Sequence, residues 1–335
     1  MVTADDGWGF SVGALFRTTD GGRNWTQVLR PPRNMSAEGS AIAAGFYGSS
    51  DVWVAVPGQG TMTLYDSHDA AGSWRKVTLS VPDGHAEPIP RFIDFVDATH
   101  GWLWAGFDSG GAESGTLFAT VDGGKHWTPV AQADSSGTSA IPLEGSKTGL
   151  AFRNDENGWL TVGDPALGVA QLYATSDGGR TWVLQDVPPP RAPGALQVRS
   201  LLPVTFANGS GVLLALLSQS GAGAASEEIY RTPDWGGTWH QAQEVSADTV
   251  GLFVSFPDSQ HGVLTDGRDM YVTTDGGATW TSFTPNVSLL GIAQLDFLSP
   301  QVGFALLPQP DGLVLATTDG GHSWSGSHPP AHVVF

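Results

Sequence analysis

"TTDGGRNW", Thr18–Trp25, is the first of seven similar eight-residue stretches in this chain of 335 residues. In every copy the tryptophan follows the aspartate by five residues, whereas successive aspartates are 41 to 57 residues apart. A constant spacing inside a variable period indicates a rigid corner between loops of variable length. The other copies are "SHDAAGSW" from Ser67, "TVDGGKHW" from Thr120, "TSDGGRTW" from Thr175, "TPDWGGTW" from Thr232, "TTDGGATW" from Thr273 and "TTDGGHSW" from Thr317.

Each stretch is flanked by short alternating segments, such as "ALFRT" before the first copy and "WTQV" after it. Alternation of apolar and polar residues predicts half-buried strands, so each copy is expected to form the corner of a hairpin. The aspartate can accept backbone N–H groups across the turn, the glycines can adopt positive φ, and the tryptophan can be buried between sheets. We therefore predict structural roles for Asp20, Asp69, Asp122, Asp177, Asp234, Asp275 and Asp319, and for Trp25, Trp74, Trp127, Trp182, Trp239, Trp280 and Trp324.

A second repeated pattern lies upstream of each corner. It is clearest in "DDGWGFSV" from Asp5, "HGWLWAG" from His100 and "NGWLTVG" from Asn157, and weaker in "GVLLALL", "HGVLTD" and "VGFALLP". Another strand pattern precedes it, as in "RFIDFVD" from Arg91. Each repeat thus has four strands, A to D, and this period predicts the blades of a β-propeller.

The stretches resemble the Asp-box, or BNR repeat, and their pairing with a "GW" strand is most similar to photosystem II stability/assembly factor-like propellers. The resemblance implies an all-β fold: a single seven-bladed propeller over residues 1–335, with four-stranded antiparallel blades. Its corners lie at 18–25, 67–74, 120–127, 175–182, 232–239, 273–280 and 317–324. We expect residues 331–335 to complete the first blade and close the ring. The copy with Ala70 and Ala71 lacks the glycines, so we expect a different turn there.

Composition disfavours several classes of partner and cofactor. The chain has 15 Lys and Arg against 33 Asp and Glu, a net charge of −18, which disfavours nucleic acid and anionic membranes. It has no cysteine, and its nine histidines show no metal-ligand spacing, so neither a metal site nor a cofactor is expected. The first ten residues, "MVTADDGWGF", have neither the basic region nor the apolar region typical of a signal peptide, and no apolar run reaches about 18 residues. We expect a monomeric, extracytoplasmic or secreted bacterial protein without direct membrane insertion, whose signal or anchor is absent from this sequence.

Strand order predicts a binding face. The corners and the short A–B turns share one face, whereas the long insertions, such as 131–148, belong to the other. Near that loop face, Arg91 and Arg199 could hold an acidic group. Asp94 and Asp296 occupy one shared A-strand position, and we expect them to face each other across a wet central channel. They are expected to be two hydrated carboxylates, and the functional alternative is a cation or polar-ligand site. Photosystem assembly members of the family carry an arginine-rich surface, but arginines are scattered here.

The sequence favours a non-enzymatic scaffold that presents its loop face to a protein or carbohydrate partner. The alternative is a glycan-active hydrolase of sialidase or glycosidase type. A sialidase needs three converging arginines and an Arg-Ile-Pro element, which "YRTP" from Tyr230 matches poorly. Xyloglucan-type glycosidases place two carboxylates between two propellers, and this chain encodes one. No catalytic residue is predicted.

Overall fold

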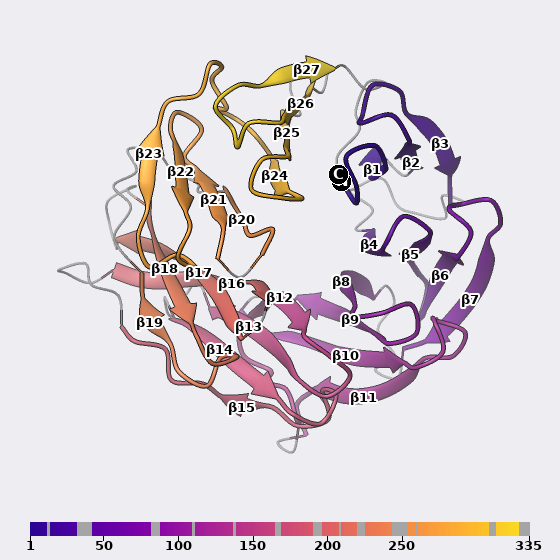
Figure 1. Cartoon of the computed structure of the whole chain (residues 1–335). Helices are drawn as coiled ribbons and strands as arrows, with labels where there is room; N and C mark the ends of the chain where they lie inside the picture. Colours follow the sequence, from indigo (N-terminus) through magenta and orange to yellow (C-terminus); the bar gives the residue numbers. More distant parts are fainter. Residues whose placement is uncertain are drawn as a thin grey trace. The chain divides into compact units, whose positions relative to one another are not determined.

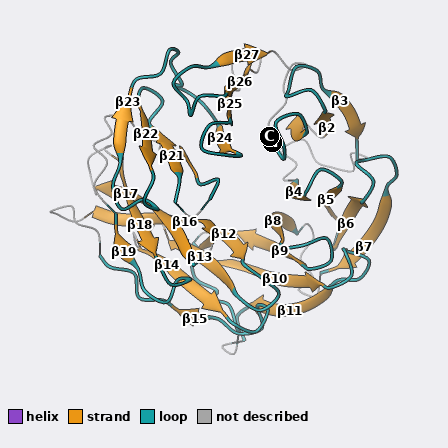
Figure 2. Cartoon of the chain, in the orientation of Figure 1, coloured by secondary structure: helices purple, strands orange, loops and turns teal. Residues whose placement is uncertain are grey.

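The computed structural model describes residues 1–11, 14–31, 42–81, 88–108, 111–136, 139–164, 169–189, 196–207, 209–219, 225–242, 253–258, 260–307 and 313–327. Within these ranges the chain forms strands and loops without a helix (Figure 2). No helix in the described part is therefore long and apolar enough to span a membrane.

The described strands form seven antiparallel sheets, called blades 1 to 7 in chain order (Figure 1). Blade 1 has three described strands and the others have four. This confirms the predicted fold class, an all-β seven-bladed propeller. The strands are β1 (Gly7–Ser11), β2 (Ala14–Thr18) and β3 (Thr26–Leu29) in blade 1; β4 (Ala43–Tyr47), β5 (Asp51–Gly58), β6 (Thr61–Ser67) and β7 (Arg75–Ser80) in blade 2; β8 (Ile89–Phe95), β9 (Gly101–Asp108), β10 (Glu113–Thr120) and β11 (Thr128–Ala133) in blade 3; β12 (Ser146–Phe152), β13 (Gly158–Asp164), β14 (Val169–Thr175) and β15 (Val183–Leu184) in blade 4; β16 (Leu196–Ala207), β17 (Ser210–Gln219), β18 (Ala225–Thr232) and β19 (His240–Gln241) in blade 5; β20 (Phe253–Ser255), β21 (Gly262–Thr265), β22 (Met270–Thr273) and β23 (Thr281–Phe283) in blade 6; and β24 (Gln294–Phe297), β25 (Gly303–Leu307), β26 (Leu313–Thr317) and β27 (Ser325–Ser327) in blade 7.

The chain divides into two compact units. Pro31–Val187 with Gln197–Pro203 form the unit that contains blades 2 to 4. Met1–Arg30, Pro188–Leu196 and Val204–Phe335 form the unit that contains blades 1, 6 and 7 and most of blade 5. The predicted closing strand, 331–335, lies outside the described residues, as do residues 32–41, 82–87 and 190–195 of the insertions at 30–41, 81–90 and 186–198.

The corner of blade 4 shows how the repeated stretch folds. Asp177 Oδ1 accepts the Thr175 hydroxyl at 2.8 Å and the Thr181 N–H at 2.9 Å, while Oδ2 accepts the Thr181 hydroxyl at 2.6 Å. The Thr175 oxygen in turn accepts the Gly179 N–H at 3.0 Å. The hydroxyl and the carboxylate thus satisfy the backbone donors of a turn too tight to pair them with each other.

Each corner is also bonded to the A–B turn of its own blade. In blade 4 the Gly178 N–H donates to the Glu156 carbonyl at 2.8 Å, and all seven corners make the equivalent bond. The corners and the short A–B turns therefore lie together within each blade, as strand order predicted. The turn requires two successive left-handed residues, which Gly178 (φ 72°) and Gly179 (φ 87°) adopt without a steric penalty.

The prediction of a different turn at Ala70 and Ala71 was wrong. These alanines adopt φ of 59° and 70°, the same left-handed pair that the glycines form elsewhere. Asp69 makes the standard bonds, including 2.8 Å from the Ser73 N–H, and the Ala71 N–H donates to Ser67 Oγ at 2.9 Å. The network of side-chain acceptors imposes the turn even where Cβ atoms oppose it.

The "GW" pattern follows from packing against the A strand. Phe95, the last residue of β8, pairs with Gly101, and a Cβ atom on Gly101 would lie 2.5 Å from the Phe95 ring. The glycine therefore leaves space for the aromatic ring to lie flat on the sheet. The same steric relation holds for Phe152 over Gly158 in blade 4.

The tryptophan after that glycine joins one blade to the next. The Trp102 indole of blade 3 stacks on Phe152 of blade 4, with centroids 3.6 Å apart and planes 1° apart. Its N–H donates to the carbonyl of Gly178, in the blade 4 corner, at 3.0 Å. The corner tryptophan, Trp182, meets the other side of the phenylalanine edge-on at 6.0 Å. This three-ring layer bonds the B strand of one blade to the A strand and corner of the next.

The junction between blades 2 and 3 repeats the layer. Trp53 stacks on Phe95 at 3.4 Å, donates to the Gly123 carbonyl at 3.1 Å, and Trp127 meets Phe95 edge-on at 5.9 Å. In both cases the first glycine of the corner supplies the accepting carbonyl. The first glycine of each of these two corners thus has a second role, because its carbonyl group accepts the indole N–H of the preceding blade.

The left-handed alanines lead to a first prediction. Replacing both Ala70 and Ala71 with glycine should stabilise the fold by about 1 kcal/mol, because relief of left-handed strain exceeds the entropy cost of glycine. Thermal unfolding would measure this gain. The control, Ala119→Gly in β10, should destabilise the protein, because that residue has ordinary strand geometry; a loss of stability in the double variant would contradict the account.

The corner aspartates predict acid sensitivity. Hydrogen bonds from the Ser323 side chain and backbone lower the pKa of Asp319 to about 2. Hydrogen bonds from the Ser73 side chain and backbone lower the pKa of Asp69 to about 2 in the same way. Both values lie below the pKa of about 4 of an unfolded chain, so the stabilisation is present above pH 4 and is lost as the pH falls to about 2. The melting temperature of Asp319→Asn should therefore depend less on pH than that of the wild type between pH 4 and pH 2; parallel curves would contradict this.

Candidate functional site

Arg91 lies where β8 begins, at the loop end of blade 3. A bulge between Pro90 and Phe92 interrupts the pairing of β8 with β9, which leaves Arg91 outside the ladder. Its Nε lies 3.0 Å from Glu113 Oε1 at the start of β10, and the Arg91 side chain remains 28% exposed whereas Glu113 is fully buried. The predicted binding residue therefore has a buried carboxylate that orients it.

Glu113 and Lys147 form the buried part of this cluster. Glu113 Oε1 accepts the Trp104 indole N–H at 2.7 Å, and Oε2 accepts the Lys147 N–H at 2.6 Å. The Lys147 ammonium, also buried, donates to the carbonyl groups of Glu113 at 2.9 Å, Pro142 at 2.6 Å and Gly145 at 3.2 Å. These bonds compensate the cost of removing two charges from water.

The cluster fixes the insertion that follows blade 3. Glu113 N–H donates to the Leu143 carbonyl at 3.0 Å, and Gly145 N–H donates to the Gly111 carbonyl at 2.9 Å. The described part of this insertion is thus bonded to the B–C connection of its own blade. Arg91, Glu113 and Lys147 together carry one net positive charge in a chain whose net charge is −18.

Sequence reasoning found Arg91 but missed Glu113 and Lys147. Their contact joins residues 34 positions apart, and nothing in the local pattern around either residue marks it. The scarcity of lysine, with only Lys76, Lys125 and Lys147 in the chain, is the signal that could have drawn attention to one that is buried. Arg199 lies in β16, and its side chain is outside the described part of the chain.

Asp94 is bonded to the neighbouring blade. Its Oδ2 accepts the N–H of Phe152, the last residue of the next A strand, at 2.5 Å. Ser255 occupies the same A-strand position in blade 6, and its Oγ accepts the N–H of Phe297 in blade 7 at 2.8 Å. The shared position was interpreted from sequence as lining a wet channel, and the structure gives it a role between A strands of adjacent blades. A cation or polar-ligand site at Asp94 and Asp296 stays a prediction.

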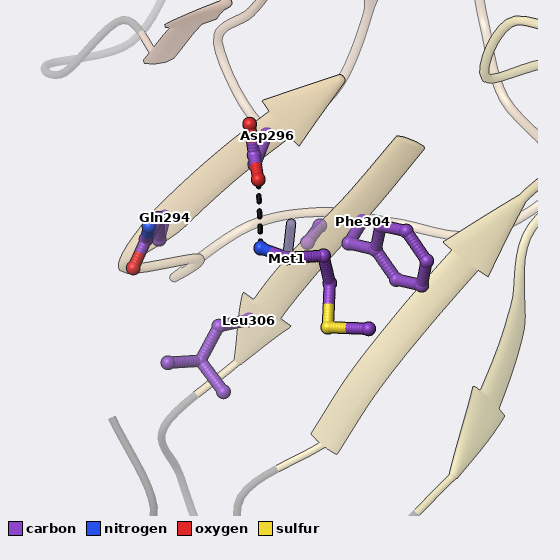
Figure 3. Close-up of a pocket in the computed structure, with 6 residues that line it drawn as sticks. Met1, Gln294, Asp296, Phe304 and Leu306 are labelled. Atoms are coloured by element: carbon purple, nitrogen blue, oxygen red, sulfur yellow. Dashed lines mark hydrogen bonds and ion pairs between the residues drawn. The ribbon is translucent and has the colours of Figure 1, made fainter. Parts of the chain in front are cut away.

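Asp296 extends this relation to blade 1. Its Oδ2 accepts from the Met1 nitrogen at 2.8 Å, beside a small apolar pocket lined by Phe304 and Leu306 (Figure 3). A Cβ atom on Gly7 would collide with the Met1 sulfur, just as one on Gly101 would collide with the Phe95 ring. Met1 therefore occupies in blade 1 the place that an A-strand phenylalanine has elsewhere.

The described ranges contain no group of three or more His, Asp or Glu arranged to hold a metal ion. Two histidines pair with single aspartates in turns: His261 Nδ1 lies 2.8 Å from Asp258 Oδ2, and His100 Nδ1 lies 2.9 Å from Asp97 Oδ2. These pairs support the A–B turns of blades 6 and 3.

Comparison with known proteins supports the resemblance seen in the sequence. The chain is 27% identical over 198 residues to the chloroplastic photosystem II stability/assembly factor HCF136 of Cyanidioschyzon merolae, covering 51% of this chain and 39% of that protein. It is also 27% identical over 194 residues to the photosystem II assembly protein Ycf48 of Thermosynechococcus vestitus, covering 55% of this chain and 44% of that one. The aligned regions thus span about two fifths of these relatives' length. No protein-family model matches the chain.

Two solved structures share the fold. A structure of Ycf48 bound to a D1 peptide matches with a TM-score of 0.53 at 18% identity, covering 86% of this chain and 82% of that one. An α-L-arabinofuranosidase from Fusarium graminearum matches with a TM-score of 0.51 at 13% identity, covering 97% and 98%. Since one neighbour is an assembly factor and the other a glycosidase, the fold does not decide between the two functions.

Asp94 provides a pH-dependent prediction. Burial raises the pKa of Asp94 to about 6, although hydrogen bonds from the Phe152 and Phe95 N–H groups lower it. Because the pKa in the folded chain is the higher one, Asp94 favours the folded state less as the pH rises from about 4 to 6, by about 2–3 kcal/mol in total. Asp94→Asn keeps an acceptor for Phe152 and cannot ionise. Its stability relative to wild type should therefore increase between pH 4 and pH 6 in denaturant titrations, and a pH-independent difference would contradict the assignment.

Proposed function

We propose that this protein is a non-enzymatic assembly scaffold that holds a segment of a protein partner. The similarity to HCF136 and Ycf48 carries the proposal, because two assembly factors match the sequence and one fold neighbour is bound to a peptide. The seven stretches then act as Asp-box corners of a single propeller domain, and the aspartates and tryptophans in them are structural.

The Arg91 cluster, comprising Arg91, Glu113 and Lys147, is the site we propose for the partner on the loop face. Its net positive charge and the partly exposed Arg91 suit a carboxylate of the bound segment. Glu113, fully buried and bonded to Trp104 and to the Lys147 N–H, limits the orientations of Arg91. A preoriented guanidinium loses less entropy on binding than a free one. Arg199 is a second candidate on the same face.

No observation favours the hydrolase. A pKa of about 6 would suit Asp94 for general acid catalysis. Its hydrogen bond from the Phe152 N–H, however, gives Asp94 a structural role in the contact between blades 3 and 4. We also propose that the protein is monomeric and extracytoplasmic in a bacterium, consistent with the absence of cysteine and the acidic balance.

A charge change at Arg91 tests the site. Arg91→Glu would place a second carboxylate beside buried Glu113 and would destabilise the blade, so Arg91→Gln is the better variant. The D1 peptide that is bound in the Ycf48 structure is the probe, with affinity measured by calorimetry. We expect Arg91→Gln to weaken binding about tenfold, because one charge-assisted hydrogen bond is lost.

The matched control is Arg180→Gln on the corner face, where Arg180 Nη1 donates to the Asp177 carbonyl at 2.6 Å. This variant should bind the peptide like the wild type. Equal losses in both variants, or loss only in the control, would contradict the loop face, and failure of the wild type to bind the peptide would contradict this partner.

A further inference from the structure

A pocket of about 300 Å³ lies between blades 6 and 7 on the corner face. Its walls include Val263 at the start of β21, Val272 near the end of β22 and Pro300 in the A–B turn of blade 7. The two corners contribute Thr274 and Gly320, and His261, Asp319 and His322 also line the pocket. The pocket is thus bounded by corner and turn residues of two adjacent blades within one compact unit.

Strand register identifies the residue that fills the equivalent space at another blade junction. Val263 follows Gly262 as Trp102 follows Gly101, and Gly320 is the first glycine of its corner as Gly178 is in blade 4. At the junction of blades 3 and 4 the indole of Trp102 reaches the Gly178 carbonyl at 3.0 Å. At the junction of blades 6 and 7 a valine stands in place of that indole.

At the junction of blades 2 and 3 the equivalent carbonyl, that of Gly123, lies within hydrogen-bond distance of three side chains. The Gly123 carbonyl accepts from Trp53 Nε1 at 3.1 Å and Arg75 Nη2 at 3.0 Å, and lies 3.2 Å from His68 Nε2. His68 corresponds in its corner to Thr274, and Asp66, the partner of Arg75, corresponds to Val272. Smaller or apolar residues thus replace the tryptophan, the histidine and the buried carboxylate at the pocket.

These substitutions determine the chemistry that the pocket can accept. Two valines and a proline provide apolar walls. Asp319 also lines the pocket, but its carboxylate accepts hydrogen bonds from Thr317 and Ser323 of its own corner. Gly320 lies where its equivalents accept an N–H group. A flat apolar ring with a single N–H donor meets both requirements, and a volume of about 150 Å³ already accommodates benzene.

We propose that this pocket binds the tryptophan side chain of a partner polypeptide, with the indole N–H donating to the Gly320 carbonyl. The bound indole would restore the hydrogen bond to the corner carbonyl that Trp53 and Trp102 make within the chain. The site lies on the corner face and is independent of the Arg91 cluster, so either proposal can fail without the other.

The probe is N-acetyl-tryptophanamide, titrated against the full chain and followed by ligand-observed NMR. For a ligand of this size, about 0.3 kcal/mol per heavy atom gives a dissociation constant of about 0.1–1 mM. The 1-methylindole analogue, which lacks the N–H, should bind about fivefold more weakly, because one hydrogen bond is lost.

Two variants fill the pocket from within. Val263→Trp should abolish binding and raise the melting temperature by about 2 °C or more. Val263→Phe, which introduces the residue that blade 7 has at this position (Phe304), should also abolish binding and keeps the test available if the larger variant does not fold. Val121→Trp is the matched control: Val121 occupies the Thr274 position in the blade 3 corner, is 71% exposed, and should leave binding unchanged.

Saturable binding that both Val263 variants remove and the control retains would support the proposal. Absence of binding at about 10 mM, ten times the weakest expected constant, would overturn it. So would equal affinity for the methylated analogue, or binding that persists in a folded Val263 variant.

Discussion

The Trp102 indole lies against Phe152 of the next blade and donates its N–H to the Gly178 carbonyl in that blade's corner. This contact requires both the ring of the A strand and the carbonyl of the corner to be fixed in position. The ring is fixed because a glycine beneath it leaves space, and the carbonyl because Asp177 and Thr175 hold the turn. The repeated sequence is therefore the set of residues that one inter-blade layer needs.

Where the pattern changes, the molecule gains other properties. Polar residues at the A-strand position, Asp94 and Ser255, add a hydrogen bond to the next blade, and burial at this position raises the pKa of Asp94. Loss of the tryptophan at Val263 leaves a pocket instead of a filled layer. The long insertion after blade 3 is bonded to its own blade through buried Lys147 and Glu113. Binding functions are proposed at two of these departures because the repeated scaffold determines the geometry around each.

Local pattern was enough to predict the corners, the strands and the number of blades, since a five-residue spacing and strand alternation need no distant information. Even so, the different turn expected at Ala70 and Ala71 was wrong, because side-chain acceptors outweigh the preference of alanine. The contacts of Glu113 and Asp94 could not be predicted from the sequence. Their partners, Lys147 and Phe152, are 34 and 58 residues away, and only the packing of one blade on another brings them together.

The central claim is that the indole and the phenylalanine of adjacent blades stabilise the fold together. A double-mutant cycle with Trp102→Leu and Phe152→Leu, analysed by denaturant unfolding, measures their coupling directly. The account predicts a favourable coupling of about 0.5–1.5 kcal/mol between the two rings. Additive losses, with a coupling indistinguishable from zero, would contradict it.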